Sequence, residues 1–584
     1  MQLQLIPDIP RSKDVATAVD ILAASGGLEE RGAVFTKAGV VDAILNLCGY
    51  TPDAELENRR LLEPSFGNGD FLLEAIRRLA ESFVRSGIPM AHAAKLLSDS
   101  SRGVEIHRST FHKTSQRAVA ALIDSGFDME TVEHLVGRWL INDDFLLANM
   151  DGRFDFVVGN PPYVRQERIP DPLLKVYKYE YTTLYDRADL YVLFYERGLD
   201  LLRANGVLGF ICANRWIKNK YGGPLRQKVG DRFHLKYYID LERANAFHSE
   251  VIAYPAITVI QRASGNRTLV ALASRDTAVG LGEIVASLKS EAVGVIPGGE
   301  GVEIAEMADV ACGRDPWLLD APEVMAILRD LEHSFPTVEE AGAKVGIGVA
   351  TGADRVFIGD YDELPVEEAR KLRLAMAADC IDGVVSWSGH GLVNPYTESN
   401  QLAPLDEFPL FARHMEENSE ALKKRHTARK QPSKWYKTID RIYPHLTGKP
   451  KLLIPDIKGE ATVAYDDGLC YPHHNLYVVT SEVWNLRALQ AVLRSSVALM
   501  FVAAYCVRMS GGFLRFQAQY LRRIRCPLWS DLSEAEKASL IKVATEADQD
   551  IVDSVVLPVY GLTGHKARFV CAFARGARVK RRSK

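Results

Sequence analysis

Residues 154–163 read Phe-Asp-Phe-Val-Val-Gly-Asn-Pro-Pro-Tyr, a hydrophobic run that ends in a polar, proline-rich turn. The run from Phe154 to Val158 is typical of a buried strand. Two successive prolines remove two backbone donors and fix φ near about −65°, so the carbonyl oxygens of the turn are held as acceptors. Asn160 adds a side-chain carbonyl. Converging acceptors suit a planar amino group, with an ordinary Pro-Pro turn as the less favoured alternative.

Three upstream segments repeat this order of a short strand followed by polar residues. Residues 60–62 precede the turn Glu63 to Asp70, in which two glycines allow the backbone to approach a ligand closely. Residues 103–106 contain Glu105, an acid suited to ribose hydroxyls. Residues 139–141 precede Asn142-Asp143-Asp144-Phe145, where an acid and an aromatic ring suit an adenine. Taken singly, each segment is equally compatible with an ordinary turn or a solvated side chain.

Short apolar runs alternate with amphipathic stretches of helical length from about residue 60 to residue 262. This alternation predicts a doubly wound α/β sheet. Helices are expected over Asp70 to Ser86 and over Leu190 to Arg203, the second stopped by Asn205-Gly206. Further strands are expected at 207–211, 235–239 and 256–260. Because ligands bind at the carboxyl ends of strands in such sheets, the four polar segments are expected at one edge.

The pattern changes after about residue 265, where Gly-rich stretches such as VGVIPGGEGVE interrupt the alternation. We therefore expect a catalytic domain over residues 1–310 and an independent α+β unit over 320–530. In that unit, helices are expected at 323–333 and 409–425, and strands at 345–349, 452–454 and 475–479. Residues 531–584 are expected to form closing helices and a basic tail.

Composition limits the class of protein. A chain of 584 residues with 47% hydrophobic and 25% charged residues has a globular balance and room for several domains. The net charge of −4 excludes a general polycation, so any surface for nucleic acid must be local. The eight cysteines lie far apart, without zinc-ligand spacing, which favours a reducing compartment. No signal peptide or membrane span is indicated, so a cytoplasmic protein without a membrane partner is expected.

Taken together, the motifs resemble those of gamma-class N6-adenine DNA methyltransferases, and NPPYVRQERI at 160–169 is particularly similar to the Eco57I-type restriction-modification methylases. The segment EPSFGNGDFL at 63–72 resembles the S-adenosylmethionine motif of this family, and NDDFL at 142–146 resembles its cofactor-adenine motif. The segment RGAVFTK at 31–37 resembles the N-terminal cofactor motif whose position defines the gamma order. The chain departs from many relatives at Ser65-Phe66 and at Lys37, where Ala-Cys and proline are frequent.

The resemblance implies a Rossmann-like, S-adenosylmethionine-dependent methyltransferase. The implied cofactor-binding residues are Phe35, Thr36, Glu63, Pro64, Gly67, Gly69, Glu105, Asp144 and Phe145. The implied catalytic residues are Asn160, Pro161, Pro162 and Tyr163. In this interpretation Asn160 and the Pro161 carbonyl hold the target N6, and Tyr163 stacks on an adenine flipped out of the duplex. Direct transfer requires neither a covalent enzyme intermediate nor a metal.

The C-terminal unit resembles the target recognition domain of the family through residues 346–354, 434–437 and 451–456. A basic run with interleaved aromatics is expected to contact DNA phosphates, with a solvated helix face as the alternative. The residues expected to contact DNA or the target base are Phe247, Lys424, Arg425, Arg429, Lys434, Trp435, Tyr436 and Arg522. The expected partners are double-stranded DNA and a cognate restriction endonuclease or other defence proteins, with the methyltransferase itself a monomer.

Three alternatives use the same motifs. Enzymes that methylate ribosomal RNA guanine or protein glutamine also use Asn-Pro-Pro-Tyr, but they rarely need a second unit of this size. An inactive methyltransferase fold that only binds DNA is disfavoured by the intact residues 160–163. A combined nuclease is disfavoured because Pro455-Asp456 and Glu460 lack the acid-x-Lys of a metal nuclease.

Overall fold

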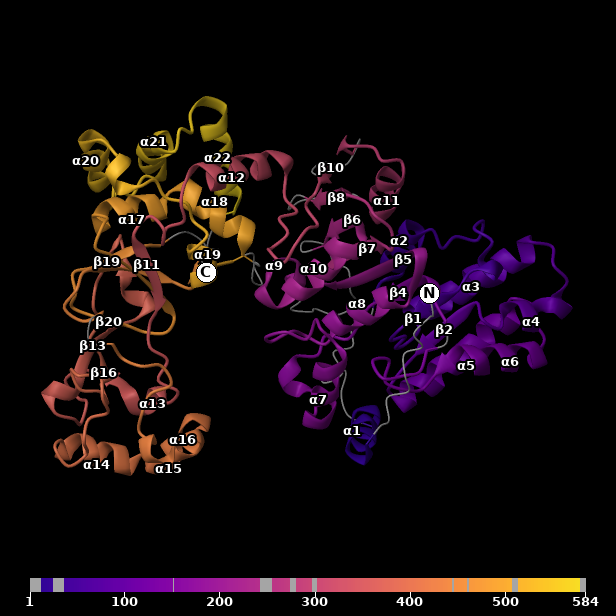
Figure 1. Ribbon diagram of the computed structural model, residues 1–584, viewed down its shortest axis with the longest axis horizontal. Helices are drawn as coiled ribbons and strands as arrows, with labels where there is room; N and C mark the ends of the chain where they lie inside the picture. Colours follow the sequence, from indigo (N-terminus) through magenta and orange to yellow (C-terminus); the bar gives the residue numbers. More distant parts are fainter. Residues whose placement is uncertain are drawn as a thin grey trace. The chain divides into compact units, whose positions relative to one another are not determined.

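The computed structural model describes residues 12–24, 36–150, 152–241, 255–273, 280–296, 302–443, 446–458, 462–506 and 513–577. The chain divides into two compact units, Met1–Pro322 and Glu323–Lys584, which are treated separately below (Figure 1).

One large sheet organises the first unit. Within the described ranges its strands lie in the order β3 (Leu140–Ile141), β2 (Ser101–Val104), β1 (Leu61–Glu63), β4 (Phe154–Gly159), β5 (Leu202–Ala213), β7 (Pro255–Gln261), β6 (His234–Asp240), β8 (Arg267–Ala273), β10 (Val302–Ala308) and β9 (Gly294–Val295).

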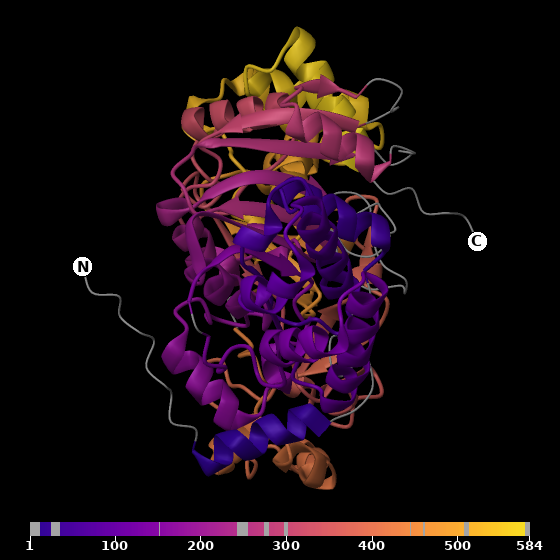
Figure 2. The same ribbon diagram turned by 90° about the vertical axis from the view of Figure 1, so that its right-hand side faces the viewer.

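The two halves of this sheet differ in strand direction. Strands β3, β2, β1, β4 and β5 are parallel, as the sequence predicts. Beyond them, β7 runs antiparallel to both β5 and β6, and β10 runs antiparallel to β8 and β9. Strands β8, β9 and β10 come from the region after residue 265 that the sequence pattern leaves unclassified, and in Figure 2 the strands of this half lie stacked beside one another.

Helices cover both faces of the sheet, which gives three layers. One core contains residues of α2 (Ala38–Cys48), α3 (Asp70–Arg85), α4 (Ala93–Leu97), α5 (Arg108–Asp124), α6 (Met129–Trp139) and α11 (Leu281–Lys289). The other contains residues of α1 (Lys13–Ala24), α7 (Asp171–Glu180), α8 (Tyr191–Asp200), α9 (Arg215–Lys218) and α10 (Gly223–Arg232). Successive strand residues alternate between the cores, with Leu61 in the first and Leu62 in the second.

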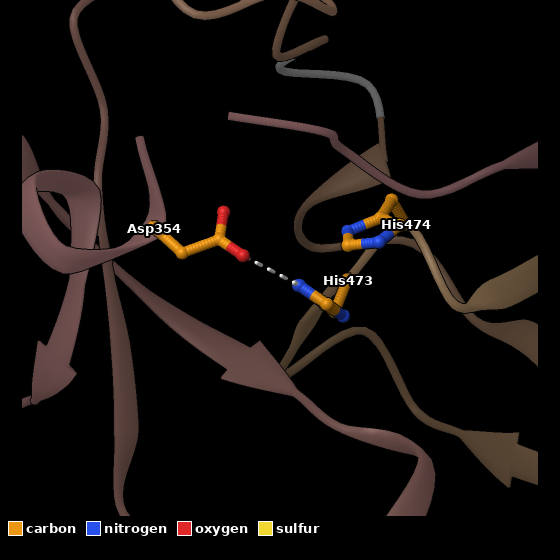
Figure 3. Close-up of side chains that lie close together, drawn as sticks. All are labelled: Asp354, His473 and His474. Carbon is orange, nitrogen blue, oxygen red and sulfur yellow. Dashed lines mark ion pairs between the residues drawn. The ribbon is translucent and has the colours of Figure 1, made fainter. Parts of the chain in front are cut away.

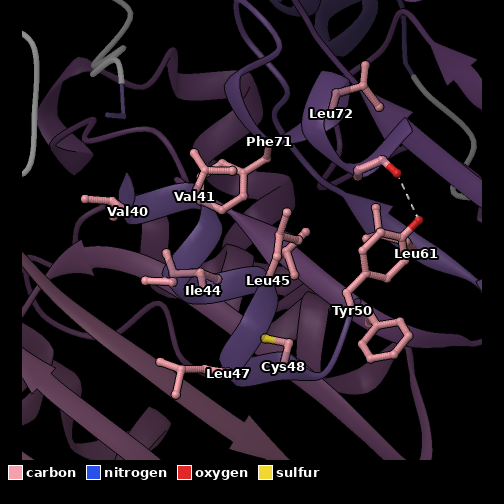
Figure 4. Close-up of a cluster of buried hydrophobic side chains, with 14 of the residues drawn as sticks. Val40, Val41, Ile44, Leu45, Leu47, Cys48, Tyr50, Leu61, Phe71 and Leu72 are labelled. Atoms are coloured by element: carbon pink, nitrogen blue, oxygen red, sulfur yellow. Dashed lines mark hydrogen bonds between the residues drawn. The ribbon is translucent and has the colours of Figure 1, made fainter. Parts of the chain in front are cut away.

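Helix α2 shows how closely the first layer approaches the sheet. Its Val41, Ile44 and Leu45 are almost fully buried and belong to the same hydrophobic core as Leu61 and Phe71 (Figure 4). At Gly209 of β5, an added Cβ would lie 2.3 Å from Cys48 Sγ and 2.9 Å from Ile44 Cγ2. Only glycine permits this contact between helix and strand.

The predicted helix over 190–203 is too long. Helix α8 ends at Asp200, and β5 already pairs with β4 at Leu202. Asn205, with φ of +63°, and Gly206 lie inside β5, where the register with β4 shifts. Asn205 N donates to Arg262 O, and Arg262 N donates to Gly206 O. The two residues therefore form backbone hydrogen bonds to the segment that follows β7, and they do not end a helix.

The second unit has an α+β architecture, as the sequence predicts. A six-stranded sheet within the described residues has the order β11 (Ala343–Ile347), β21 (Leu476–Ser481), β17 (Lys451–Pro455), β19 (Ala464–Asp466), β15 (Val384–Val385) and β14 (Cys380–Ile381). A smaller sheet has the order β12 (Ile358–Asp360), β16 (His390–Val393), β13 (Lys371–Ala375) and β20 (Tyr471–Pro472), and β18 (Ile457–Lys458) pairs with β22 (Leu514–Arg515).

Helices complete this unit, and one of them is not continuous. The predicted helix over 409–425 breaks at Asn418, whose Nδ2 donates to His414 O and competes with the helical bonds. The helices are α12 (Pro322–Ser334), α13 (Asp354–Phe357), α14 (Pro409–Glu417), α15 (Ser419–Lys423), α16 (His426–Lys430), α17 (Leu486–Arg494), α18 (Ser496–Tyr505), α19 (Ala518–Leu521), α20 (Glu534–Lys542), α21 (Gln549–Val559) and α22 (Gly564–Ala577).

The closing helices pack within this unit, α20 against α17 and α22 against α18. Among the described residues, no single helix combines the length and the apolar character needed to cross a bilayer; only α17 and α18 taken together, across a 58° bend, meet that test.

Candidate active site

A cavity opens at the carboxyl ends of strands β1, β2, β3 and β4. The space within it, together with the open solvent at its mouth, amounts to about 1310 Å³. The four polar segments identified in the sequence all line it, because each follows one of these neighbouring parallel strands. Of the residues with an implied cofactor or catalytic role, those in the lining are Thr36, Glu63, Pro64, Gly67, Glu105, Asp144, Phe145, Asn160 and Pro162.

The glycine turn after β1 is fastened to the next strand. Phe66 N donates to Val104 O at 3.1 Å, and Gly67 N donates to Glu105 Oε2 at 2.9 Å. Gly69 is not itself in the lining, but its φ of +86° lets the chain enter α3, and an added Cβ would lie 2.8 Å from Thr114 Cγ2. The turn therefore presents backbone to the cavity at the start of a helix.

Two buried carboxylates lie on either side of this turn. Glu105 is 5% exposed, and its Oε1 accepts a bond from His107 N at 2.8 Å. These two bonds from backbone N–H groups fix the orientation of the carboxylate in the cavity lining. Glu63 is 2% exposed, and its Oε2 has no hydrogen-bond partner within the described part of the chain.

Burial raises the pKa of Glu63 well above its usual value, and the charges of Asp70 and Glu105 raise it further. Acidic side chains outnumber basic ones among the lining residues: Glu63, Asp70, Glu105, Asp143 and Asp144 against Arg168 and His107. An excess of acidic side chains around the cavity favours a positively charged ligand.

Asp144 is held by a residue that lies outside every sequence motif. Tyr177 of α7 donates its hydroxyl to Asp144 Oδ2 at 2.6 Å, and Leu146 N donates to Oδ1 at 2.9 Å. Burial raises the pKa of Asp144, and the bond from Tyr177 opposes that shift. Phe145 is buried against Phe194, with ring centroids 5.1 Å apart. Tyr177 comes from a helix remote in sequence, so no local pattern could identify it.

Asn160 follows β4 and is bonded to the N-terminal segment. Its Nδ2 donates to Thr36 Oγ1 at 3.1 Å, and Thr36 N donates to Asp70 Oδ2 at 2.8 Å. Pro161 is buried, and neither it nor Tyr163 lines the cavity. The Tyr163 ring lies 6.2 Å from that of Tyr191, and its buried hydroxyl lacks a hydrogen-bond partner among the described residues.

The structure adds lining residues that lie outside every motif quoted from the sequence. They are Leu22, His107, Thr110, Tyr177, Leu190 and Phe194. Phe35 and Phe247, which the resemblance implies in the site, lie outside the described residues.

Some of the residues expected to bind DNA form hydrogen bonds within the protein, and others are exposed at its surface. Arg425 donates to the carbonyls of Leu422, Thr351, Trp435 and Lys437, which ties several loops together. Lys434 is exposed, Lys424 pairs with Glu420 at 2.6 Å, and Arg429 bonds Lys424 O.

The two aromatic residues of this run are half-buried. Trp435 lies under Lys423 Nζ, 4.5 Å from its ring centroid, and Tyr436 donates its hydroxyl to Ala403 O. Arg522 follows α19, elsewhere in the unit, and pairs with Glu339.

One group of described residues has the composition of a metal site. Asp354, His473 and His474 place their ligand atoms within 4.8 Å of one another, and His473 Nε2 lies 4.0 Å from Asp354 Oδ2 (Figure 3). Ligands of one tetrahedral zinc lie about 3.3 Å apart, so this arrangement is too wide as it stands. The expectation that catalysis uses no metal stays a prediction.

Comparison with known proteins identifies the family. Residues 92–247 match the Eco57I restriction-modification methylase family, and residues 411–526 match the TaqI-like C-terminal specificity domain. The chain is 50% identical over 554 residues to the type II methyltransferase M.PaeR7I of Pseudomonas aeruginosa, covering 95% of this chain and 96% of that protein. The chain belongs to the type II restriction-modification DNA methyltransferases. It is also 47% identical to the type II methyltransferase M.XhoI of Xanthomonas vasicola, over 91% of this chain and 98% of that protein.

Solved structures share the fold of this methyltransferase. The type IIL restriction-modification enzyme MmeI, solved in complex with DNA, aligns with a TM-score of 0.56 and 14% identity over 92% of this chain and 76% of that one. The predictions of family and fold class are confirmed, and S-adenosylmethionine is the cofactor expected for this methyltransferase.

Proposed function

We propose that this methyltransferase transfers a methyl group to the N6 amine of adenine in double-stranded DNA, with the target base flipped out of the helix. The observation that supports this most strongly is the presence of Asn160 and Pro162 in the same cavity as the glycine turn, Glu105 and Asp144. A group that grips an amine and a set of groups suited to a nucleoside therefore meet at one sheet edge.

The cavity fits S-adenosylmethionine, which supplies an electrophilic methyl group on a positively charged sulfonium. Glu105 has oriented lone pairs for the ribose hydroxyls, and Asp144 accepts bonds at the adenine end, where Phe145 is packed. The buried carboxylate of Glu63, with one oxygen that has no partner among the described residues, offers a counter-charge to the cationic part.

On the substrate side, the Asn160 carbonyl and the Pro161 backbone carbonyl accept bonds from the two protons of the adenine amine. These bonds draw the nitrogen lone pair out of conjugation with the ring, which makes it nucleophilic. Extrusion of the base costs a few kcal/mol of stacking and pairing, which contacts in the pocket offset. Tyr163 is proposed to stack on the flipped adenine, and Phe247 to form the opposite wall of the pocket.

DNA recognition is assigned to the second unit, with the catalytic domain at 1–310, the recognition domain at 320–530 and the closing helices and tail at 531–584. The exposed lysines around Trp435 are proposed to contact phosphates, which position the duplex without reading its sequence. The enzyme is proposed to act as a monomer in the cytoplasm, in partnership with a cognate restriction endonuclease.

The experiment is nucleoside analysis of duplex DNA incubated with the purified enzyme and labelled S-adenosylmethionine. The expected product is N6-methyl-2′-deoxyadenosine from DNA, with no label in parallel reactions on ribosomal RNA or release factor. Methylcytosine as the labelled nucleoside would overturn the adenine assignment, and labelling of RNA or protein alone would favour the other amino-group methyltransferases.

A further inference from the structure

Thr36 connects three segments that are far apart in the sequence. Its backbone N–H donates to Asp70 Oδ2 at 2.8 Å, across 34 residues, and its hydroxyl oxygen accepts a bond from Asn160 Nδ2 at 3.1 Å, across 124 residues. Thr36 is 3% exposed, so water does not compete freely for either bond. The bond to Asn160 is thus a long-range link to the residue proposed to grip the substrate amine.

The orientation of the Asn160 amide decides whether it can act. Its two ends have nearly the same shape, but Oδ1 accepts and Nδ2 donates. If Nδ2 faced the substrate, its N–H groups would meet the N–H groups of the adenine amine, and no hydrogen bond could form between them. Because Nδ2 donates to the Thr36 hydroxyl, this bond selects the amide orientation in which Oδ1 lies on the other side, as the proposed grip on the amine requires.

The position of Thr36 is itself fixed by the cofactor half of the site. Asp70 is the first residue of α3 and follows the glycine turn directly, and both Thr36 and Asp70 line the cavity. The bond from Thr36 N to Asp70 therefore aligns the hydroxyl with the turn, while β4 carries Asn160. The position of the Asn160 amide is therefore set by the cofactor half of the site as well as by strand β4.

We propose that Thr36 is a positioning residue for the Asn160 amide, beyond the contact with cofactor that the sequence resemblance implies. The inference rests on the proposed role of Asn160. A residue that only contacts the cofactor would affect mainly the affinity for cofactor. If Thr36 positions the amide, loss of its hydroxyl should instead weaken the bond between Asn160 and the adenine amine more than it weakens cofactor binding.

The first test compares Thr36→Val with Thr36→Ser in the full-length enzyme. Valine keeps the shape and removes the acceptor, so kcat should fall about 10- to 100-fold, while the Kd for S-adenosylmethionine stays within about twofold. Serine retains the acceptor and should restore kcat to within about threefold of the wild type. Melting temperatures of both variants check folding.

A second readout requires no turnover. The cofactor-free enzyme is titrated with duplexes that carry adenine or unsubstituted purine, which lacks the amine, at the target position. The wild type should prefer adenine, Thr36→Val should lose most of that preference, and Thr36→Ser should keep it. Thr114→Val is the matched control: this buried hydroxyl bonds Gly67 O at 2.8 Å, so its loss should weaken cofactor binding and leave the adenine preference intact.

A double-mutant cycle distinguishes this inference from the proposed function. Thr36→Val added to Asn160→Ala should cause no further loss of kcat, because the amide it positions is already gone. A fully additive loss, or a Thr36→Val variant that loses cofactor affinity and keeps its preference for adenine, would overturn the positioning role. If Asn160→Ala alone left kcat unchanged, the proposed function of Asn160 would be the part that fails.

Discussion

Among single residues, Glu63 is the most strongly perturbed by its surroundings in the cavity. Burial and then the charges of Asp70 and Glu105 raise its pKa well above the usual value of about 4.3. A carboxyl group with a raised pKa in the folded state stabilises the fold below its unfolded pKa, and that contribution is lost as the pH rises through the folded pKa.

Glu63→Gln should therefore remove this pH dependence from the cofactor-free enzyme. Its free energy of unfolding should approach the wild-type value near pH 4 and exceed it increasingly as the pH rises toward 8. Urea unfolding of both proteins across this range measures the difference. Parallel pH profiles for the two proteins would show that Glu63 is not held in an unfavourable environment.

Asp144 and Tyr177 yield a graded prediction for cofactor affinity. Asp144→Ala should weaken binding of S-adenosylmethionine about 10-fold or more, since it removes the acceptor at the adenine end, whereas Tyr177→Phe removes only the bond that orients it and should cost less. Calorimetric titration of both variants gives the two affinities. Unchanged affinity in Asp144→Ala would reassign this end of the cavity.

At this scale the sequence locates the residues that follow strands and misses those that come from elsewhere. Glu105, Asp144 and Asn160 could be found because each stands within three residues of the end of a predicted strand. Tyr177 and the link from Thr36 to Asn160 depend on tertiary packing, for which no local pattern exists.

Among the elements, α2 and β5 depend on one another through Gly209. An added methyl would lie 2.3 Å from Cys48 Sγ, so helix and strand would have to move apart. Gly209→Ala should lower the free energy of unfolding by about 1–3 kcal/mol, as overpacking does. Denaturant unfolding measures this, with the exposed Gly39→Ala in α2, where nothing lies near the added Cβ, as the control. Equal stabilities of the two variants would contradict the close packing.

The ends of helices α3 and α8 show when a local sequence pattern predicts an element boundary and when strand pairing overrides it. Helix α3 begins and ends as predicted to within one residue, because its turn and its periodicity agree. Helix α8 ends early, because β5 pairs with β4 from Leu202 onward and draws Asn205-Gly206 into a strand. A helix stop and a strand bulge use the same two residues, so only the neighbouring strand decides between them.

For the whole molecule, the parallel half of the sheet and the α+β character of the second unit follow from the sequence. In the mixed half, β6 and β7 match the strands expected at 235–239 and 256–260. Strands β8, β9 and β10 are not predicted, because they lie after residue 265, where the alternating pattern ends, and the antiparallel pairing is not predicted either. The motifs at the strand ends still define the site, since that depends only on the parallel strands β1 to β4.

DNA binding is the property that tests the second unit. Lys434→Glu should weaken duplex affinity about 10-fold and reduce the slope of log K against log salt concentration by about 0.9, the value for one lost phosphate contact. Lys542→Glu in α20, also exposed, makes the same change in net charge and is the control. Equal effects of the two variants would assign the loss to overall charge and not to a DNA-contacting surface near Trp435.

The central claim is that the Asn160 carbonyl grips the substrate amine beside a separately formed cofactor cavity. The most direct measurement is methyl transfer and S-adenosylmethionine binding by Asn160→Ala, made on the same preparation. Transfer should fall at least about 10²- to 10³-fold, comparable to the loss of a group that stabilises a transition state, while cofactor affinity stays within about twofold. Loss of cofactor binding in step with transfer, or transfer at the wild-type rate, would contradict the account.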